Sequence, residues 1–246
     1  CSVIGIDKDP TAIKLCKHLS DKYDNFTSIH GSFANLSGYL PSLGFDKIDG
    51  ILLDLGTSSM QLDNPERGFS FKYNSPLDMR MSQTGETAYD IVNSLSEGSL
   101  ANLIYNFGEE RKSRKIAKAI IDERKTNKIV TTFDLNKVIL KVKKIRDRKI
   151  HPSTKTFQAL RIYINHELKD LYHALISAER VLSEGGKLIV ISFHSLEDRI
   201  VKNFIRENSV SYKNYDPNNN DKTFVYQTRR VIKPSAEEIK INRRSR

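Results

Sequence analysis

The chain has 246 residues, of which 38% are hydrophobic and 28% are charged, and its formal net charge is +10. This length allows one large or two small domains, and no apolar run approaches the roughly 20 residues that span a bilayer. Two cysteines and no secretory pattern at the start exclude a disulfide framework. We therefore expect a reducing, cytoplasmic setting.

The positive charge is concentrated in two blocks, residues 109–149 and 227–246, where Lys and Arg clearly outnumber Asp and Glu. The rest of the chain is net acidic. Basic blocks on an acidic body are typical of polyanion binding. A solvated helix face would explain one such run, but two separate runs favour nucleic acid.

Short apolar runs separated by helical patterns predict an α/β fold. Asp9 and Pro10 provide a cap and a first residue for a helix after the first strand. Strands connected through helices pair in parallel by right-handed crossovers. Strands are expected at residues 2–7, 26–33, 49–55 and 187–193, the last after a turn at 184–186, and at 224–232 after a polar loop at 216–221.

The strand pattern disappears between residues 72 and 164, where apolar positions recur at helical spacing. We expect an inserted all-helical domain here. The core of the fold would then comprise residues 1–71 and 165–246. Helices are expected at 87–94, 100–107, 113–124, 132–144 and 156–178.

Residues 54–81 (DLGTSSMQLDNPERGFSFKYNSPLDMRM) are the most informative segment of the chain. They follow DGILL at 49–53, which has the pattern of a buried parallel strand that ends in a carboxylate. The long loop that follows is rich in Gly, Ser, Asp and Asn. Loops at the carboxyl ends of parallel strands are where α/β proteins bind ligands and react.

This segment resembles the signature of the bacterial small-subunit ribosomal RNA cytosine-N4 methyltransferases, which use S-adenosylmethionine. The resemblance runs from Gly5 to about Arg246, and it recurs at GEERKSR (108–114), HPSTKTFQALRIYIN (151–165) and ISFHSLEDRIVK (191–202). It implies a class I (Rossmann-like) methyltransferase sheet with the inserted helical domain. It also implies small-subunit ribosomal RNA or the small ribosomal subunit as partner, and no membrane. It leaves open whether the protein forms a homodimer.

The family's Gly-rich loop, which approaches the methionine part of the donor, would precede Ser2 together with the first strand of the sheet. We expect either that the chain is truncated at its N-terminus or that it cannot bind the cofactor.

Four residues match the family's cofactor contacts: Asp7, Phe33, Asp54 and Gln61. Asp7, at a strand end, would accept hydrogen bonds from the ribose diol, although such residues often only cap helices. Phe33 would lie against the adenine, whereas a Phe at a strand end is usually part of the core. Asp54 would meet the adenine amine or the donor's ammonium group, and Gln61 offers both a donor and an acceptor.

For catalysis the protein must position the cytosine amine and accommodate the shift of charge. The Asn/Asp-Pro-Pro-aromatic motif of many amino methyltransferases is absent. Asp54, Ser58 and Ser59 occupy the equivalent loop and are the first candidates. His194 follows the strand at 187–193 and could also reach the site, although a His after a strand is more often structural.

Arg111, Lys112, Arg114 and Lys115 are the candidate phosphate contacts. Pairing with nearby acidic residues along one helix is the alternative, at a few tenths of a kcal/mol per pair. The two cysteines and six histidines show no metal-ligand spacing, so no metal site is expected.

A non-enzymatic RNA-binding or ribosome-assembly protein derived from a methyltransferase is the competing function. A nicotinamide dehydrogenase is disfavoured, because the chain has no GxGxxG start and the basic blocks would go unexplained.

Overall fold

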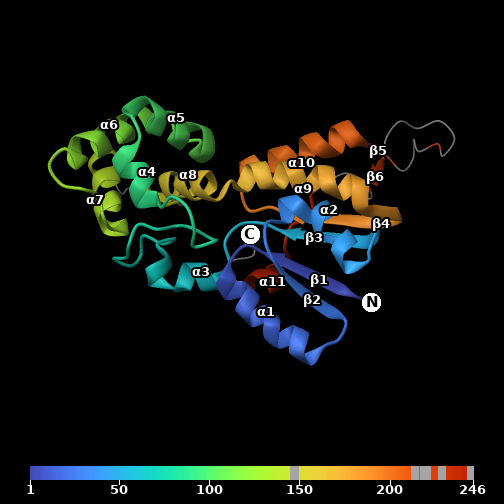
Figure 1. Ribbon diagram of the computed structural model, residues 1–246. Coiled ribbons are helices and arrows are strands. Elements are labelled where there is room, and N and C mark those ends of the chain that lie inside the picture. The colour runs from blue at the N-terminus through green and yellow to red at the C-terminus, as the bar shows by residue number, and fades with distance from the viewer. Residues whose placement is uncertain (145–149, 212–215, 217–222, 227–230, 243–246) are drawn as a thin grey trace. The chain divides into compact units, whose positions relative to one another are not determined.

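A computed structural model describes residues 1–144, 150–211, 216, 223–226 and 231–242 of this chain, and it shows mixed α/β structure (Figure 1). The chain divides into two compact units. The first comprises Cys1–Phe33 and Thr57–Asp170, and the second comprises Ala34–Gly56 and Leu171–Arg246. No helix in the described part of the chain is both long and apolar enough to cross a membrane.

The first unit opens with the expected strand–helix–strand motif. Strand β1 (Val3–Asp7) pairs in parallel with β2 (Phe26–His30), and Asp7 lies opposite His30. Helix α1 (Pro10–Lys22) connects them, and the Asp9 side chain caps it, as the sequence predicts. Strand β2 is shorter than expected because the chain turns into the 3-10 helix η1 (Phe33–Asn35).

The helices expected between residues 72 and 164 are present in the first unit. They are α4 (Ala88–Ser94), α5 (Glu97–Gly108), α6 (Ser113–Arg124), α7 (Thr132–Val142) and α8 (Thr154–Asn165), after the short α3 (Ser59–Asp63) and η3 (Pro65–Arg67). The prediction of one helix over 156–178 is wrong. His166 adopts a left-handed backbone (φ 55°), which ends α8 and starts α9 (Glu167–Val181).

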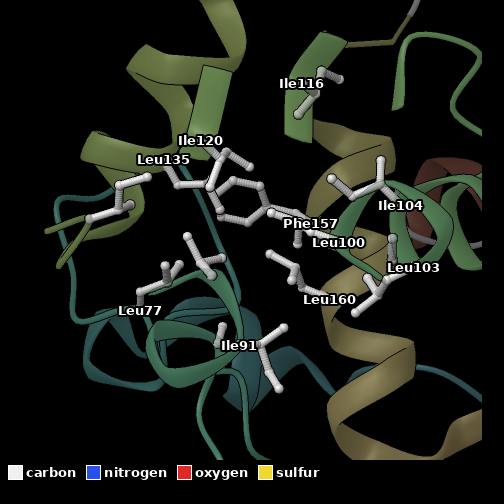
Figure 2. Packing of buried hydrophobic residues seen from close by; sticks show 14 of the residues in the cluster. Leu77, Ile91, Leu100, Leu103, Ile104, Ile116, Ile120, Leu135, Phe157 and Leu160 are labelled. Atoms are coloured by element: carbon white, nitrogen blue, oxygen red, sulfur yellow. The ribbon is translucent and has the colours of Figure 1, made fainter. Parts of the chain in front are cut away.

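These helices enclose their own hydrophobic core, to which the loop before them contributes Leu77 (Figure 2). Ile104, Ile120 and Leu160 are fully buried. Their spacing on α5, α6 and α8 places one apolar stripe of each helix toward the others. Gly108 lets α5 approach α8 closely, because a Cβ there would lie 2.4 Å from the Lys155 carbonyl oxygen.

The second unit contains a parallel pair formed by β3 (Ile48–Asp54) and β4 (Leu182–Ile191), in which Asp54 lies opposite Ile191. A second parallel pair joins β5 (Ser209–Ser211) to β6 (Phe224–Tyr226). The helical elements are α2 (Leu36–Tyr39), η2 (Pro41–Leu43), most of α9, α10 (Ser195–Asn208) and α11 (Ala236–Ile241).

Two expectations for this unit need correction. Strand β4 begins at Leu182, so the turn expected at 184–186 lies inside the strand, beside a register irregularity at Ile48/Gly50. The third strand is not buried on both faces: Leu53 is 7% exposed but Leu52 is 63% exposed, since successive side chains point to opposite faces. Strand β6 is described over Phe224–Tyr226, within the strand expected at 224–232. The expected continuation over 227–230, and most of the polar loop expected at 216–221, lie outside the described residues.

Within the described residues the strands form three two-stranded parallel pairs. Parallel pairing is confirmed for β1–β2 and β3–β4, each of which is connected through helices. Their union in one methyltransferase sheet stays a prediction.

Candidate functional site

In the first unit, the carboxyl ends of β1 and β2 carry two of the expected cofactor residues. Asp7 Oδ1 accepts a hydrogen bond from the Asp9 amide at 2.7 Å, and the Asp7 carbonyl accepts one from Gly31. Burial raises the pKa of the Asp7 carboxyl, and the nearby Asp9 carboxylate adds to this effect. Phe33 is half-buried at the start of η1, shortly after β2. A partly desolvated acceptor at a strand end is suited to bind a diol.

Asp9, which the sequence identifies only as a helix cap, is the most deeply buried carboxylate of this region, at 1% exposure. Its Oδ1 accepts the Thr11 amide, and its Oδ2 accepts Gln61 Nε2 at 2.8 Å and Arg67 Nη1 at 2.9 Å. Burial alone would raise the pKa of Asp9. The hydrogen bonds from Gln61, Thr11 and Arg67 outweigh that effect and leave its pKa below the ordinary value.

Ser58 and Gln61 form a capping box at the start of α3. The Ser58 hydroxyl accepts the Gln61 amide, and Gln61 Oε1 accepts the Ser58 amide at 3.1 Å. Because Gln61 Nε2 also binds Asp9, both ends of this buried side chain contact protein groups. Each residue therefore has a structural role that is independent of its expected catalytic or cofactor role.

In the second unit, Asp54 and His194 come to the same end of the β3–β4 pair. Asp54 is the last residue of β3, and His194 follows β4 as the N-cap of α10. His194 Nδ1 accepts the Glu197 amide at 3.4 Å, and its Nε2 lies 3.2 Å from Glu197 Oε1. Gly56 allows the segment after β3 to lie close to the segment after β4, because a Cβ at Gly56 would lie only 3.3 Å from the Phe193 ring.

Asp54 is exposed, yet the protein atoms around its carboxyl exclude enough water to raise its pKa. A carboxylate with a raised pKa accepts a proton more readily. The strand ends thus supply two carboxylates with raised pKa values, Asp7 in the first unit and Asp54 in the second.

The four expected RNA contacts lie at the start of α6. Arg111, Lys112, Arg114 and Lys115 are all exposed, and α6 has no acidic residue in its first turn. Among the described residues, none of the four joins a salt bridge. Glu110 instead forms a buried ion pair with Lys143, which lies outside α6, so the alternative of pairing along one helix is wrong for Glu110.

Sequence reasoning missed Asp9 and Arg67 as parts of the site region. The only signal was their position, since Asp9 is two residues from Asp7 and Arg67 lies in the NPERGF segment. Their pairing spans 58 residues of chain and could not be read from local spacing.

The Asp9–Arg67 ion pair predicts a specific pH dependence of stability. Asp9→Asn should lower the free energy of unfolding at pH 7 by roughly 3–5 kcal/mol, the cost of removing one partner of a buried pair. Because the folded-state pKa of Asp9 lies below 3.8, the contribution of Asp9 is present above that value and is lost as the pH falls through the folded pKa.

Urea denaturation of both proteins between pH 7 and pH 3 would measure the effect. The difference in unfolding free energy between the native protein and Asp9→Asn should shrink toward the acid end. A difference that stays constant over this range would contradict the assigned pairing.

Comparison with known proteins identifies relatives over the full length of the chain. The model of the MraW methylase family matches residues 1–246. A protein named ribosomal RNA small subunit methyltransferase H from Rhodopseudomonas palustris strain BisA53 is 46% identical, with 99% of this chain and 75% of the relative covered. Proteins of the same name from Nitrobacter hamburgensis (47%; 99% and 75% covered) and Rickettsia bellii strain RML369-C (45%; 100% and 82%) are equally similar. This match, taken together with the strand-end carboxylates and the patterned loop, shows that the chain belongs to the MraW methylase family.

Proposed function

We propose that this protein transfers a methyl group from S-adenosylmethionine to N4 of a cytidine in the decoding region of small-subunit ribosomal RNA. The family match over residues 1–246 carries this proposal. The names of the relatives indicate small-subunit ribosomal RNA as substrate. A ribosomal substrate would place the reaction in the cytoplasm.

The proposal includes a class I methyltransferase sheet, formed by residues 1–71 and 165–246, with an inserted helical domain at 72–164. Two observations support it. Strands β1–β2 and β3–β4 pair in parallel. The helices between Ala88 and Leu160 share one hydrophobic cluster, as a domain with its own core does.

The residues at the β1 end fit the nucleoside part of the donor. Asp7 accepts hydrogen bonds and cannot donate them when ionised, so ribose hydroxyls suit it. Its raised pKa reflects a water-poor position, in which such hydrogen bonds are strong. Phe33 offers an aromatic face for the adenine, and Gln61 would contribute from the loop. When bound, S-adenosylmethionine would supply an activated methyl group on its sulfonium.

Asp54, Ser58 and His194 are the proposed catalytic residues. The cytosine amine is a weak nucleophile because its lone pair is delocalised into the ring, so an acceptor that draws on its protons assists attack. Asp54, with its raised pKa, is the strongest candidate for that acceptor. His194 and Ser58 already cap helices, so their catalytic roles would be additional to structural ones.

The start of α6 would contact the RNA backbone. Positive side chains near the N-terminus of a helix interact unfavourably with the helix dipole. An external anion bound beside the first turn of α6 would offset this interaction. Arg114 and Lys115 face solvent while Ile116 and Ala117 are buried, which leaves the cationic groups accessible. Phosphates are anions of the kind that both the dipole and the side chains attract.

The competing function is a non-enzymatic RNA-binding or assembly protein. Replacement of Asp54 separates the two, because a binder does not require an acceptor at the strand end. In the protein that contains residues 1–246, Asp54→Ala should raise the activation free energy of single-turnover methylation by about 2.7–4 kcal/mol. This is the scale for the loss of one well-placed polar group in a preorganised site. RNA affinity should be unchanged.

The assay follows a labelled methyl group to cytosine N4 in small subunits that lack the modification. Asp49→Ala is the matched control, since Asp49 is an exposed carboxylate near the other end of β3. His194→Ala should lower the rate per folded molecule only if the imidazole contacts the base; as a cap alone, it should change only the melting temperature. Label on a ring carbon or a ribose oxygen, or no transfer by the native protein, would reject the proposed function.

A second prediction concerns RNA binding. Neutral substitutions at Arg111, Lys112, Arg114 and Lys115 should weaken RNA affinity and flatten its salt dependence, by about 0.7–0.9 in the log–log slope per lost phosphate contact. Affinity for S-adenosylmethionine should not change. Fluorescence anisotropy over a range of salt concentrations would measure the slope.

The control for charge alone neutralises four exposed lysines elsewhere, namely Lys14, Lys17, Lys22 and Lys47. It removes the same total charge and should leave most of the slope intact. Equal slopes for the two variants would show that the start of α6 makes no specific phosphate contacts.

A further inference from the structure

A closed ring of hydrogen bonds in the first unit includes the two residues that follow Asp7 in the chain. Arg67 Nη1 donates to Asp9 Oδ2 at 2.9 Å, and Arg67 Nη2 donates to the Met81 carbonyl at 3.0 Å. The Met81 amide donates to Asn165 Oδ1 at 2.7 Å, and the Asn165 carbonyl accepts from Lys8 Nζ at 2.9 Å. Lys8 precedes Asp9 in the chain, which closes the ring.

Most of the ring is shielded from water, and Lys8 is its most exposed charged member, with a side chain that is 20% exposed. Asp9 is 1% exposed and Asn165 is 5% exposed, and the Arg67 side chain is 12% exposed. In such surroundings a charged hydrogen bond is strong and an unmade one is costly. The ring therefore favours one conformation of its members.

Arg67 has the central position in the ring. Its Nη2 also donates to the Arg80 carbonyl at 2.9 Å, so one guanidinium holds the Asp9 carboxylate and two backbone carbonyls of the loop. The planar, multidentate guanidinium can make these contacts together, whereas an ammonium group cannot reproduce that geometry.

Asp7 lies immediately beside two members of the ring. Lys8 is fixed by Asn165 and by an ion pair with Asp170, and Asp9 is fixed by Gln61 and Arg67. Asp7 Oδ1 in turn accepts the Asp9 amide. The direction of the Asp7 carboxylate thus depends on the backbone of residue 9, and that backbone depends on the ring.

We infer that Arg67 is a positioning residue for donor binding: it orients Asp7 through Asp9 and does not itself touch the donor. This inference rests on the proposed function, in which Asp7 binds the ribose. It assigns the Arg of the NPERGF segment a role in affinity for S-adenosylmethionine and none in the transfer step.

The test measures S-adenosylmethionine affinity by calorimetry and single-turnover methylation at saturating donor. Arg67→Met should raise the dissociation constant by at least about tenfold, by analogy with residues that orient the ligands of a metal ion. The rate at saturation should change little. Arg67→Lys keeps the charge but not the multidentate geometry. It should therefore fold more stably than Arg67→Met, yet it should still bind the donor more weakly than the native protein.

Arg80→Met is the matched control. Arg80 belongs to the same loop and its side chain pairs with Asp78, outside the ring. Its loss should leave donor affinity unchanged. Equal losses of affinity in Arg67→Met and Arg80→Met would overturn the inference, since general loosening of the loop would then explain both.

A double-mutant cycle with Asp7→Ala distinguishes positioning from a separate effect. If Arg67 acts through Asp7, Arg67→Met should cause little further loss in the Asp7→Ala background, because interacting residues are non-additive. Additive losses in a protein that binds the donor would overturn the inference alone. No binding and no methyl transfer by the native protein would instead reject the proposed function.

Discussion

The buried carboxylate of Asp9 is the constraint on which the candidate site depends. A carboxylate at 1% exposure must be paired and hydrogen-bonded or it would not remain ionised. Arg67, Gln61 and the Thr11 amide meet that requirement together. They come from η3, α3 and α1, so one local electrostatic requirement joins segments that are distant in sequence. The same contacts determine where the neighbouring Asp7 points.

The charged residues of the helical part include two contrasting classes. Lys143 and Glu110 are buried together, and Lys143 also donates to the Pro152 carbonyl, so these charges hold the fold. Arg124 likewise donates to the carbonyls of Val92 and Leu95. The cationic groups at the start of α6 are exposed and take part in no salt bridge among the described residues. A count of basic residues cannot separate these classes, but their contacts can.

Local patterns predicted much of the secondary structure, because caps and apolar spacing act within a few residues. The Asp9 cap and the helices of the 72–164 segment follow from them. Long-range and backbone-specific features did not. The left-handed backbone at His166 divides an otherwise continuous helical pattern, and the exposed face of β3 at Leu52 depends on what covers a strand. Gln61 illustrates the limit at the site: its type indicated hydrogen bonding, while its partners, Asp9 and Ser58, required the fold.

We expect the carboxylate at the end of β1, held by the Asp9 network, to bind the nucleoside of a methyl donor. A crystal structure with S-adenosylhomocysteine, the product of donor turnover, tests it most directly. We predict both ribose hydroxyls within about 2.5–3.0 Å of the Asp7 carboxylate, with Arg67 still paired to Asp9 and remote from the ligand. A nucleoside bound away from Asp7, or an Arg67 side chain that leaves Asp9 to contact the ligand, would contradict it.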